Sequence, residues 1–111
     1  MSNEWIDAAA EADLWDGAGI SVVVQGRDIA LFRIGDGHYA IDNLCTHGHA
    51  RLCDGFVEGF EVECPLHQGR FDLRTGVPTC EPAVEAVKTY LVRIEGGRVS
   101  LAHSPSGRGW G

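Results

Sequence analysis

Two cysteine–histidine pairs are the residues of this sequence best suited to chemistry. Cys45 and His47 form the first pair, Cys64 and His67 form the second, and 16 residues separate His47 from Cys64. Each pair offers one thiolate and one imidazole, which suits a [2Fe–2S] cluster in which two histidines replace two cysteines on one iron. Cys45 and Cys64 would then hold one iron, and His47 and His67 the other. Because such a cluster moves single electrons, the pattern predicts a one-electron carrier.

A structural zinc site is the main alternative, because two cysteines and two histidines also form a common zinc-binding set. Zinc fingers usually place their two cysteines close together in sequence and their two histidines close together after them. Here each pair holds one residue of each kind, and a single residue separates Cys45 from His47. The spacing therefore favours the iron–sulfur interpretation, with a zinc-stabilised binding module as the alternative.

The other histidines and cysteines are weaker candidates. His49 lies two residues after His47 and could compete as a ligand or tune the site by its charge, although a polar surface role fits it better. His38 and His103 have no motif around them. Cys53 and Cys80 are expected to be small buried apolar residues, which is the common state of a free cysteine.

Short strands must position these residues. Gly-bounded runs rich in β-branched or aromatic side chains predict strands over residues 21–25, 28–34, 39–41, 70–73, 87–95 and 98–101, and residues 56–63 alternate loosely. Gly35–Gly37 predicts a hairpin turn, whereas good helix formers predict a short helix over residues 9–15. We expect Trp5, Trp15 and Phe32 in the core. The pattern indicates an all-β fold, an antiparallel sandwich or barrel, with both pairs on loops.

Composition and charge narrow the class of protein. The chain has 111 residues, 44% of them hydrophobic, which predicts one packed domain. No apolar run approaches the ~20 residues that span a bilayer, and the N-terminus does not resemble a signal peptide, so we expect a cytoplasmic protein without a membrane partner. In a reducing cytoplasm, four cysteines favour metal binding over disulfides.

The net charge of −7 argues against nucleic acid as a partner. Residues 1–63 carry 12 acidic and 3 basic side chains, whereas residues 64–111 carry 4 acidic and 6 basic ones. An acidic surface could steer the protein toward basic docking sites on redox partners, or it could simply favour solubility. Small size and acidity also favour a monomer.

Residues 43–48 and 63–72, which contain the two pairs, resemble the Rieske ferredoxins, in particular the ferredoxin components of bacterial aromatic-ring dioxygenases of the naphthalene dioxygenase type. The resemblance extends over residues 4–102. It implies a single Rieske domain over residues 1–102, built as an antiparallel β-sandwich base with a small cluster-binding subdomain over about residues 42–80. Residues 103–111 form a tail, and the loop around Pro82 resembles the loop that covers the cluster in this family.

The resemblance also implies a function. A Rieske ferredoxin passes single electrons from a flavin-dependent reductase to a terminal Rieske non-haem iron oxygenase, which hydroxylates the aromatic substrate. The chain itself is then a carrier and not an enzyme. A catalytic oxygenase subunit would need a further mononuclear iron site with two histidines and a carboxylate, and the chain is too short for that second domain.

Four positions separate the chain from other branches of the family. Respiratory Rieske proteins carry an extra cysteine in each cluster loop, and Ala50 and Leu66 stand at those positions here. Relatives of high potential place serine and tyrosine hydroxyls near the cluster sulfurs, and Gly69 and Phe71 stand there instead. Without those hydroxyls the reduced cluster is less stabilised, so we expect a potential at the low end of the Rieske range, around −150 mV.

Overall fold

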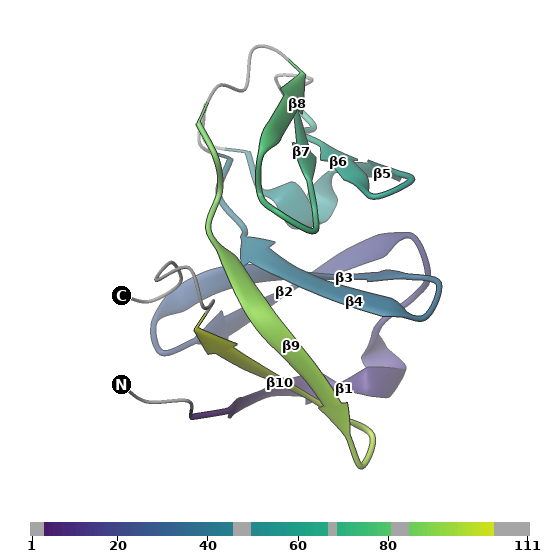
Figure 1. The fold of residues 1–111 in the computed structure, drawn as a ribbon, viewed down its shortest axis with the longest axis vertical. Helices are drawn as coiled ribbons and strands as arrows, with labels where there is room; N and C mark the ends of the chain where they lie inside the picture. The colour runs from purple at the N-terminus through teal and green to yellow at the C-terminus, as the bar shows by residue number, and fades with distance from the viewer. Residues whose placement is uncertain (1–3, 46–49, 67–68, 81–84, 104–111) are drawn as a thin grey trace.

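The computed structural model describes residues 4–45, 50–66, 69–80 and 85–103 (Figure 1). The regular elements in these ranges are strands, apart from two three-residue 3-10 helices, η1 and η2. The elements are β1 (Ile6–Ala10), η1 (Glu11–Asp13), β2 (Ala18–Val24), β3 (Arg27–Ile34), β4 (Gly37–Asp42), η2 (Leu52–Asp54), β5 (Phe56–Glu58), β6 (Glu61–Glu63), β7 (Arg70–Asp72), β8 (Pro78–Cys80), β9 (Thr89–Glu95) and β10 (Arg98–His103). No helix in these ranges is long and apolar enough to cross a bilayer.

The strands form two antiparallel sheets. The larger sheet has the order β1-β10-β9-β4-β3-β2, and β1 contacts β2, so the sheet rolls toward a closed barrel. The smaller sheet has the order β5-β6-β7-β8 and lies at one end of the rolled sheet (Figure 1). The predicted all-β architecture, a sandwich-like base with a smaller unit, is confirmed, whereas the bounds of 42–80 for that unit stay a prediction.

Strand β3 explains why the two sheets stay together. Its apolar run Ile29–Phe32 is completely buried, although side chains of a strand alternate between two faces. Ile29 and Leu31 face a barrel core inside the rolled sheet, whereas Ala30 and Phe32 face an inter-sheet core against the smaller sheet. The barrel core consists of Ala9, Leu14, Val24, Ile29, Leu31, Ala40, Tyr90, Val99 and Leu101. The inter-sheet core consists of Ala30, Phe32, Ile41, Cys45, Ala50, Leu52, Val62, Cys64, Phe71, Leu73 and Val87.

The predicted hairpin at Gly35–Gly37 is confirmed. Ile34 pairs with Gly37, so Gly35 and Asp36 form a two-residue turn between β3 and β4. Gly35 has a φ of +59°, which a residue with a side chain rarely adopts. A positive φ at the first central position matches the type II′ turns that join twisted antiparallel strands.

The helix predicted over residues 9–15 is wrong. Ala9 and Ala10 belong to β1 and pair with Val99 and Arg98 of β10, and only Glu11–Asp13 form a 3-10 turn. The local preference of alanine and glutamate for helix is weak. Pairing with a strand about 90 residues away in sequence therefore outweighs it.

The predicted burial of Trp5, Trp15 and Phe32 in the core is only partly confirmed. Phe32 is fully buried as predicted, but Trp15 is 73% exposed, and the neighbouring Leu14 enters the barrel core in its place. Trp5 is half-buried, and the guanidinium of Arg93 stacks over its ring at 4.6 Å from the centroid. Placing Trp15 in the core was therefore wrong.

Candidate metal centre

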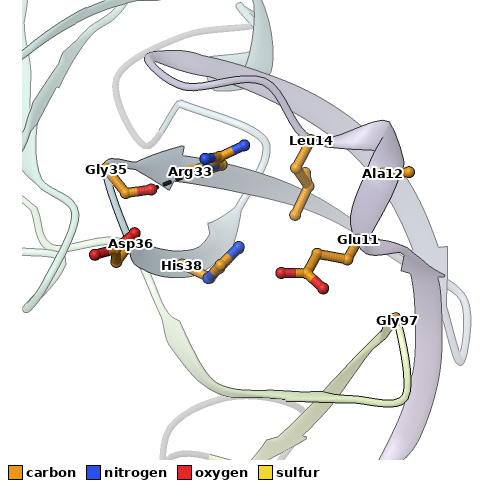
Figure 2. A pocket seen from close by; sticks show the side chains of 8 residues that line it. All are labelled: Glu11, Ala12, Leu14, Arg33, Gly35, Asp36, His38 and Gly97. Atoms are coloured by element: carbon orange, nitrogen blue, oxygen red, sulfur yellow. Dashed lines mark hydrogen bonds between the residues drawn. The ribbon is translucent and has the colours of Figure 1, made fainter.

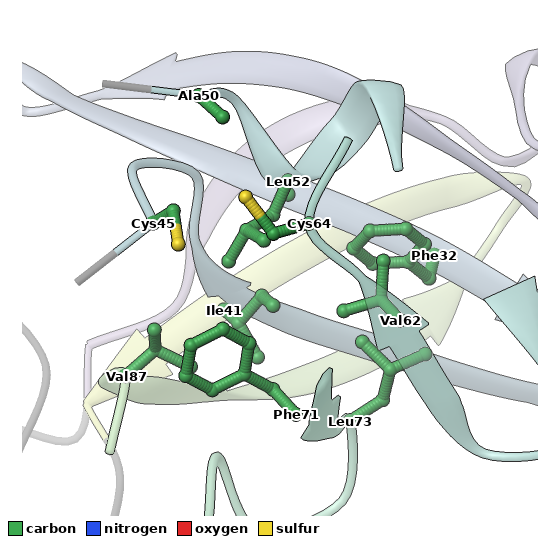
Figure 3. Packing of buried hydrophobic residues seen from close by; sticks show 11 residues of the cluster. Phe32, Ile41, Cys45, Ala50, Leu52, Val62, Cys64, Phe71, Leu73 and Val87 are labelled. Carbon is green, nitrogen blue, oxygen red and sulfur yellow. The ribbon is translucent and has the colours of Figure 1, made fainter. Parts of the chain in front are cut away.

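The two cysteines of the predicted site lie in the same core. Cys45 follows β4 on the loop that leads to η2, and Cys64 follows β6 on the loop that leads to β7. Both are buried, at 3% and 0% exposure, and both belong to the inter-sheet core (Figure 3). Neither forms a disulfide. Two loops from different sheets therefore bring two cysteine thiols into one buried region.

The two cysteine loops are closed in the same way. The backbone N–H of Cys45 donates to the carbonyl of Ala50 at 3.0 Å, and the N–H of Cys64 donates to the carbonyl of Gly69 at 2.8 Å. In each case the bond joins a cysteine to the fifth residue after it. The predicted ligands His47 and His67 fall inside these two closed loops, where they lie outside the described residues.

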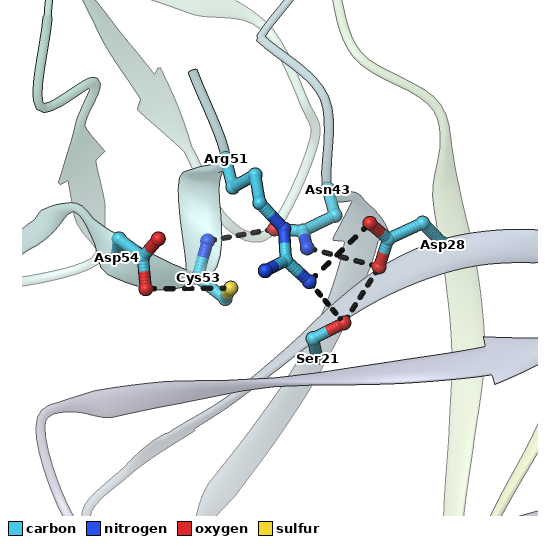
Figure 4. A network of polar contacts seen from close by, with 6 residues as sticks. All are labelled: Ser21, Asp28, Asn43, Arg51, Cys53 and Asp54. Atoms are coloured by element: carbon cyan, nitrogen blue, oxygen red, sulfur yellow. Dashed lines mark hydrogen bonds and ion pairs between the residues drawn. The ribbon is translucent and has the colours of Figure 1, made fainter. Parts of the chain in front are cut away.

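Asn43 holds the base of the first loop, a role that was not predicted from the sequence. It is the only buried polar or charged residue within the described ranges, at 0% exposure. Its side-chain oxygen accepts the N–H of Cys53 at 2.7 Å, and its side-chain nitrogen donates to Asp28 Oδ1 at 2.9 Å (Figure 4). Its backbone N–H also donates to the Asp28 carbonyl, and its carbonyl accepts the N–H of Leu52. Asn43 thus ties both ends of the first loop to β3.

Asp28 extends this network to the surface. Its carboxylate accepts hydrogen bonds from Ser21 at 2.7 Å and from Asn43, and it lies 3.5 Å from the guanidinium of Arg51 (Figure 4). Burial raises the pKa of this carboxyl, but the hydrogen bonds from Ser21 and Asn43 and the charge of Arg51 outweigh burial. The pKa of Asp28 therefore lies below its ordinary value. The ionised form of Asp28 is the one that the first loop uses.

An ionic cluster borders the second loop. Glu63 precedes Cys64 and pairs with Arg70, which follows Gly69. The guanidinium of Arg70 lies 2.8 Å from Glu58, 3.4 Å from Glu61 and 3.1 Å from Glu63. Hydrogen bonds to Glu58 and Glu61 hold the pKa of Arg70 above its ordinary value. The cross-strand pair keeps the two ends of the second loop together.

Gly76 places a third segment beside the inter-sheet core. The N–H of Val87 donates to the carbonyl of Gly76 at 3.0 Å. Gly76 has a φ of +78°, and a Cβ added there would lie 2.2 Å from the carbonyl oxygen of Val87. Only glycine allows this approach. Val87 enters the inter-sheet core as a result, whereas the predicted covering loop around Pro82 lies outside the described residues.

His38 lies in a different part of the molecule. It belongs to β4 and lines a pocket with Glu11, Leu14 and Arg33, and its imidazole and the Glu11 carboxylate extend toward each other across that pocket (Figure 2). Its Nε2 is buried, and no residue in the described ranges bonds to it. The pocket contains neither of the two predicted cysteine ligands.

The other two cysteines, Cys53 and Cys80, are less buried than predicted. Cys80, expected to be buried, is exposed, because it lies on the edge strand β8. Cys53 is only half-buried, packs against the inter-sheet core, and has a thiol whose pKa is raised by burial. His103 pairs through its backbone with Tyr90 at the end of β10, and His49 lies outside the described residues.

Comparison with known proteins agrees with this geometry. Residues 4–91 match the model of the Rieske [2Fe-2S] domain. The ferredoxin component of a naphthalene 1,2-dioxygenase system from Pseudomonas aeruginosa is 52% identical over 101 residues, which cover 91% of this chain and 97% of the relative. The ferredoxin of carbazole 1,9a-dioxygenase from Nocardioides aromaticivorans IC177 has a TM-score of 0.85 at 39% identity and covers 90% of this chain and 98% of its own.

A second solved structure shows a related ferredoxin with its partner. It is described as a complex of reduced oxygenase and oxidized ferredoxin in carbazole 1,9a-dioxygenase. The matched chain has a TM-score of 0.83 at 33% identity, and the match covers 91% of this chain and 94% of that one.

The small all-β fold places two buried cysteine thiols in one core on similarly closed loops, as a carrier of an iron–sulfur cluster requires. The chain belongs to the Rieske [2Fe–2S] family. Its cofactor is a Rieske-type [2Fe–2S] cluster, as the sequence predicted. It is a ferredoxin component, which carries electrons and does not catalyse the oxygenation itself.

Proposed function

We propose that this chain carries single electrons from a flavin-dependent reductase to a terminal Rieske non-haem iron oxygenase that hydroxylates an aromatic ring. The proposed ligands are Cys45 and Cys64 on one iron and His47 and His67 on the other. When bound, the cluster accepts and releases one electron at a time. Supporting this assignment, both thiols are buried in the same core, on loops that come from the two sheets.

The chain's own residues would hold the cluster and limit its contact with water. Buried side chains of the inter-sheet core, among them Leu52 and Val87, surround the two thiols. The backbone bonds that close the loops at Ala50 and Gly69 keep the cysteines in position. A pre-formed, apolar setting reduces the rearrangement that accompanies a change of charge, which favours rapid electron transfer.

The end of the molecule that carries the cysteines would also meet the partners. Leu44 and Leu66 flank the proposed ligands and are 56% and 68% exposed. Exposed leucines beside a redox centre offer apolar contact area for a transient complex. The related ferredoxin that was solved in complex with its oxygenase supports an oxygenase as one partner. The reductase, a cytoplasmic location and a monomeric state belong to the same proposal.

The ligand assignment is tested with His67→Ser, because a serine cannot supply an imidazole. His38→Ser is the matched control, since His38 lines a pocket away from the cysteines. We expect the control to keep the visible absorption and the reduced-state EPR signal of a Rieske cluster, and the His67 variant to lose both. An unchanged spectrum in His67→Ser would refute the assignment of this ligand.

The carrier function is tested by reconstitution. The purified protein is mixed with a flavin reductase, NADH and the terminal oxygenase of a naphthalene 1,2-dioxygenase system, and hydroxylated product is measured. We expect turnover only when all three proteins are present. Product formation at the same rate without the ferredoxin, or oxygenation by the ferredoxin alone, contradicts the proposed function.

A further inference from the structure

The outer face of the smaller sheet combines an exposed phenylalanine with several glutamates, and packing within the molecule does not explain this combination. Val57, Val62 and Phe71 point inward from β5, β6 and β7 and contact the inter-sheet core. Because strand side chains alternate, the residues between them point outward. Five of them form what we call the glutamate face, which consists of Phe56, Glu58, Glu61, Glu63 and Arg70, while Asp72 on the same side of β7 pairs with Arg74.

Phe56 is an exposed aromatic on this face. It is 69% exposed and lies on β5, the edge strand of the smaller sheet, directly opposite Glu63. Leaving a phenyl ring in water forfeits the favourable free energy of burying it. Exposed aromatics surrounded by charged residues are typical anchors of protein interfaces. Phe56 is therefore suited to insertion into an apolar recess on another protein.

The charges around Phe56 are unbalanced. Three carboxylates share the single guanidinium of Arg70, which leaves the cluster with an excess of negative charge. The side chain of Glu58 remains 75% exposed despite its contact with Arg70. Each ionised carboxylate can accept several hydrogen bonds. The face can therefore accept further arginine or lysine side chains from a partner without first breaking its own ion pairs.

The position of the face connects it to electron transfer. Glu63 is adjacent to Cys64, and Arg70 is adjacent to Gly69, whose carbonyl closes the second cysteine loop. A protein bound at this face would lie beside the second cysteine loop, not at the opposite end of the rolled sheet. Contacts here can orient a partner while the exposed leucines at the cysteine end remain free to meet it.

The geometry points to the glutamate face as a recognition surface for the terminal oxygenase, which binds it with arginine or lysine side chains around an apolar recess for Phe56. This inference rests on the proposed function, in which the oxygenase is the electron acceptor. The charge of the face is complementary to basic side chains only. Interfaces built this way gain orientation and association rate from the charges, and affinity from the buried aromatic.

Two pairs of matched variants test the inference. Glu58→Lys is compared with Glu95→Lys, because Glu95 is 76% exposed, contacts an arginine at 3.6 Å and also precedes a glycine turn, but lies on β9 at the far end of the molecule (Figure 1). Phe56→Ala is compared with Trp15→Ala, because Trp15 is 73% exposed and lies outside the smaller sheet. Each variant is reduced with dithionite, and its reoxidation by the terminal oxygenase of a naphthalene 1,2-dioxygenase system is followed by stopped-flow absorbance.

We expect Glu58→Lys and Phe56→Ala each to lower the second-order rate constant of reoxidation by about tenfold at low salt. We expect Glu95→Lys and Trp15→Ala to change it by less than about twofold. The rate constant of Glu58→Lys should also fall less steeply with added salt than that of the wild type. The midpoint potential is measured for every variant, so that a change in driving force is separated from a change in docking.

Equal slowing by Glu58→Lys and Glu95→Lys would show that only the net charge matters and would overturn the inference, as would wild-type rates in Glu58→Lys and Phe56→Ala. In both cases the wild type still delivers electrons, so the proposed function survives. A wild-type protein that the oxygenase does not reoxidise would overturn the proposed function together with the inference.

Discussion

Replacing Asn43 should weaken both the fold and the first cysteine loop. The Asn43→Ala variant removes the acceptor of the Cys53 N–H and the donor to Asp28. It leaves the backbone bonds of Asn43 to Asp28 and Leu52 in place. The variant should therefore still fold, but with a loop base that has lost its side-chain contacts.

The expected loss can be estimated from these contacts. A neutral hydrogen bond such as the one from Cys53 contributes about 1 kcal/mol, and one to a carboxylate such as Asp28 about 1.5–3 kcal/mol. Asn43 is fully buried, so the variant also leaves a void in place of the amide. The two hydrogen bonds alone sum to about 2.5–4 kcal/mol, a large part of the ~5–15 kcal/mol that stabilises a typical domain.

Two further variants separate hydrogen bonding from loss of volume. Asn43→Asp keeps the shape and the acceptor for Cys53 but places a second carboxylate beside Asp28. Like charges at this distance raise the pKa of one of the two carboxyls. A raised folded-state pKa means that the penalty is largest at neutral pH and shrinks as the pH falls through that pKa. Combining Asn43→Asp with Asp28→Asn restores one donor and one acceptor and should recover part of the loss.

The assay is urea unfolding of the oxidised protein, followed by far-UV circular dichroism and by the visible absorption of the cluster. With an m-value of about 1.5–2 kcal/mol per M, Asn43→Ala should lower the midpoint by roughly 2 M. Ser21→Ala is the control, because the Ser21 hydroxyl donates to the same carboxylate and accepts from Arg51, but both bonds are exposed to solvent, where water replaces the lost partner and the cost should stay below about 1 kcal/mol. If Asn43→Ala costs no more than this control, Asn43 does not hold the loop as we have argued.

The remaining predictions concern the pH dependence of stability, the cost of replacing two glycines, the redox potential and the salt dependence of reduction. Because the pKa of Asp28 is held below its ordinary value, its ionised form stabilises the fold above the unfolded-state pKa of about 3.9 and stops doing so as the pH falls through the folded-state pKa. Asp28→Asn should therefore destabilise at pH 7, and the difference in urea midpoints should close below about pH 4; a difference independent of pH contradicts this. Gly76 and Gly17 share a φ of +78°, but only Gly76 has a neighbouring carbonyl within reach of a Cβ. Gly17→Ala should cost about 1–2 kcal/mol for the backbone conformation alone, and Gly76→Ala clearly more; equal costs would exclude the steric explanation. Redox titration should give a potential near −150 mV, and a value above zero would refute the reasoning from Gly69 and Phe71. Reduction by the flavin reductase should slow with added salt if the acidic surface steers docking, so a rate independent of salt would remove that hypothesis.

Strand alternation and turn chemistry made much of the fold predictable. The β-branched runs, the hairpin at Gly35–Gly37 and the location of both cysteines on loops follow from local preferences that the tertiary structure retains. The error over residues 9–15 has the opposite origin, because β1 exists only through its pairing with β10. No local pattern in the sequence reports that contact. Local patterns likewise did not indicate that Leu14 would be buried and Trp15 exposed.

The kind of cofactor was predictable from the sequence, and the residues that support the site were less so. The mixed cysteine–histidine spacing was sufficient to predict the kind of cofactor. Asn43 gave a weaker signal: it is a polar residue between the end of a buried strand and Cys45, a position where an unbonded side chain would be costly. Part of the glutamate face also follows from the sequence pattern, since Glu61 and Glu63 alternate with the buried Val62. What the sequence could not supply was Arg70 as their common partner, which depends on strand register.

The supports of the two cysteines come from different sheets. Cys45 belongs to a loop whose base is bonded to β3 through Asn43, whereas Cys64 belongs to a hairpin of the smaller sheet. Both thiols nevertheless pack in the inter-sheet core, which Phe32 of β3 and Phe71 of β7 share. A substitution that shifts one sheet against the other must therefore change the separation of the two cysteines, even if each loop keeps its own hydrogen bonds. We therefore expect the spectrum of the bound cluster to respond to substitutions in this core as well as to substitutions of the ligands.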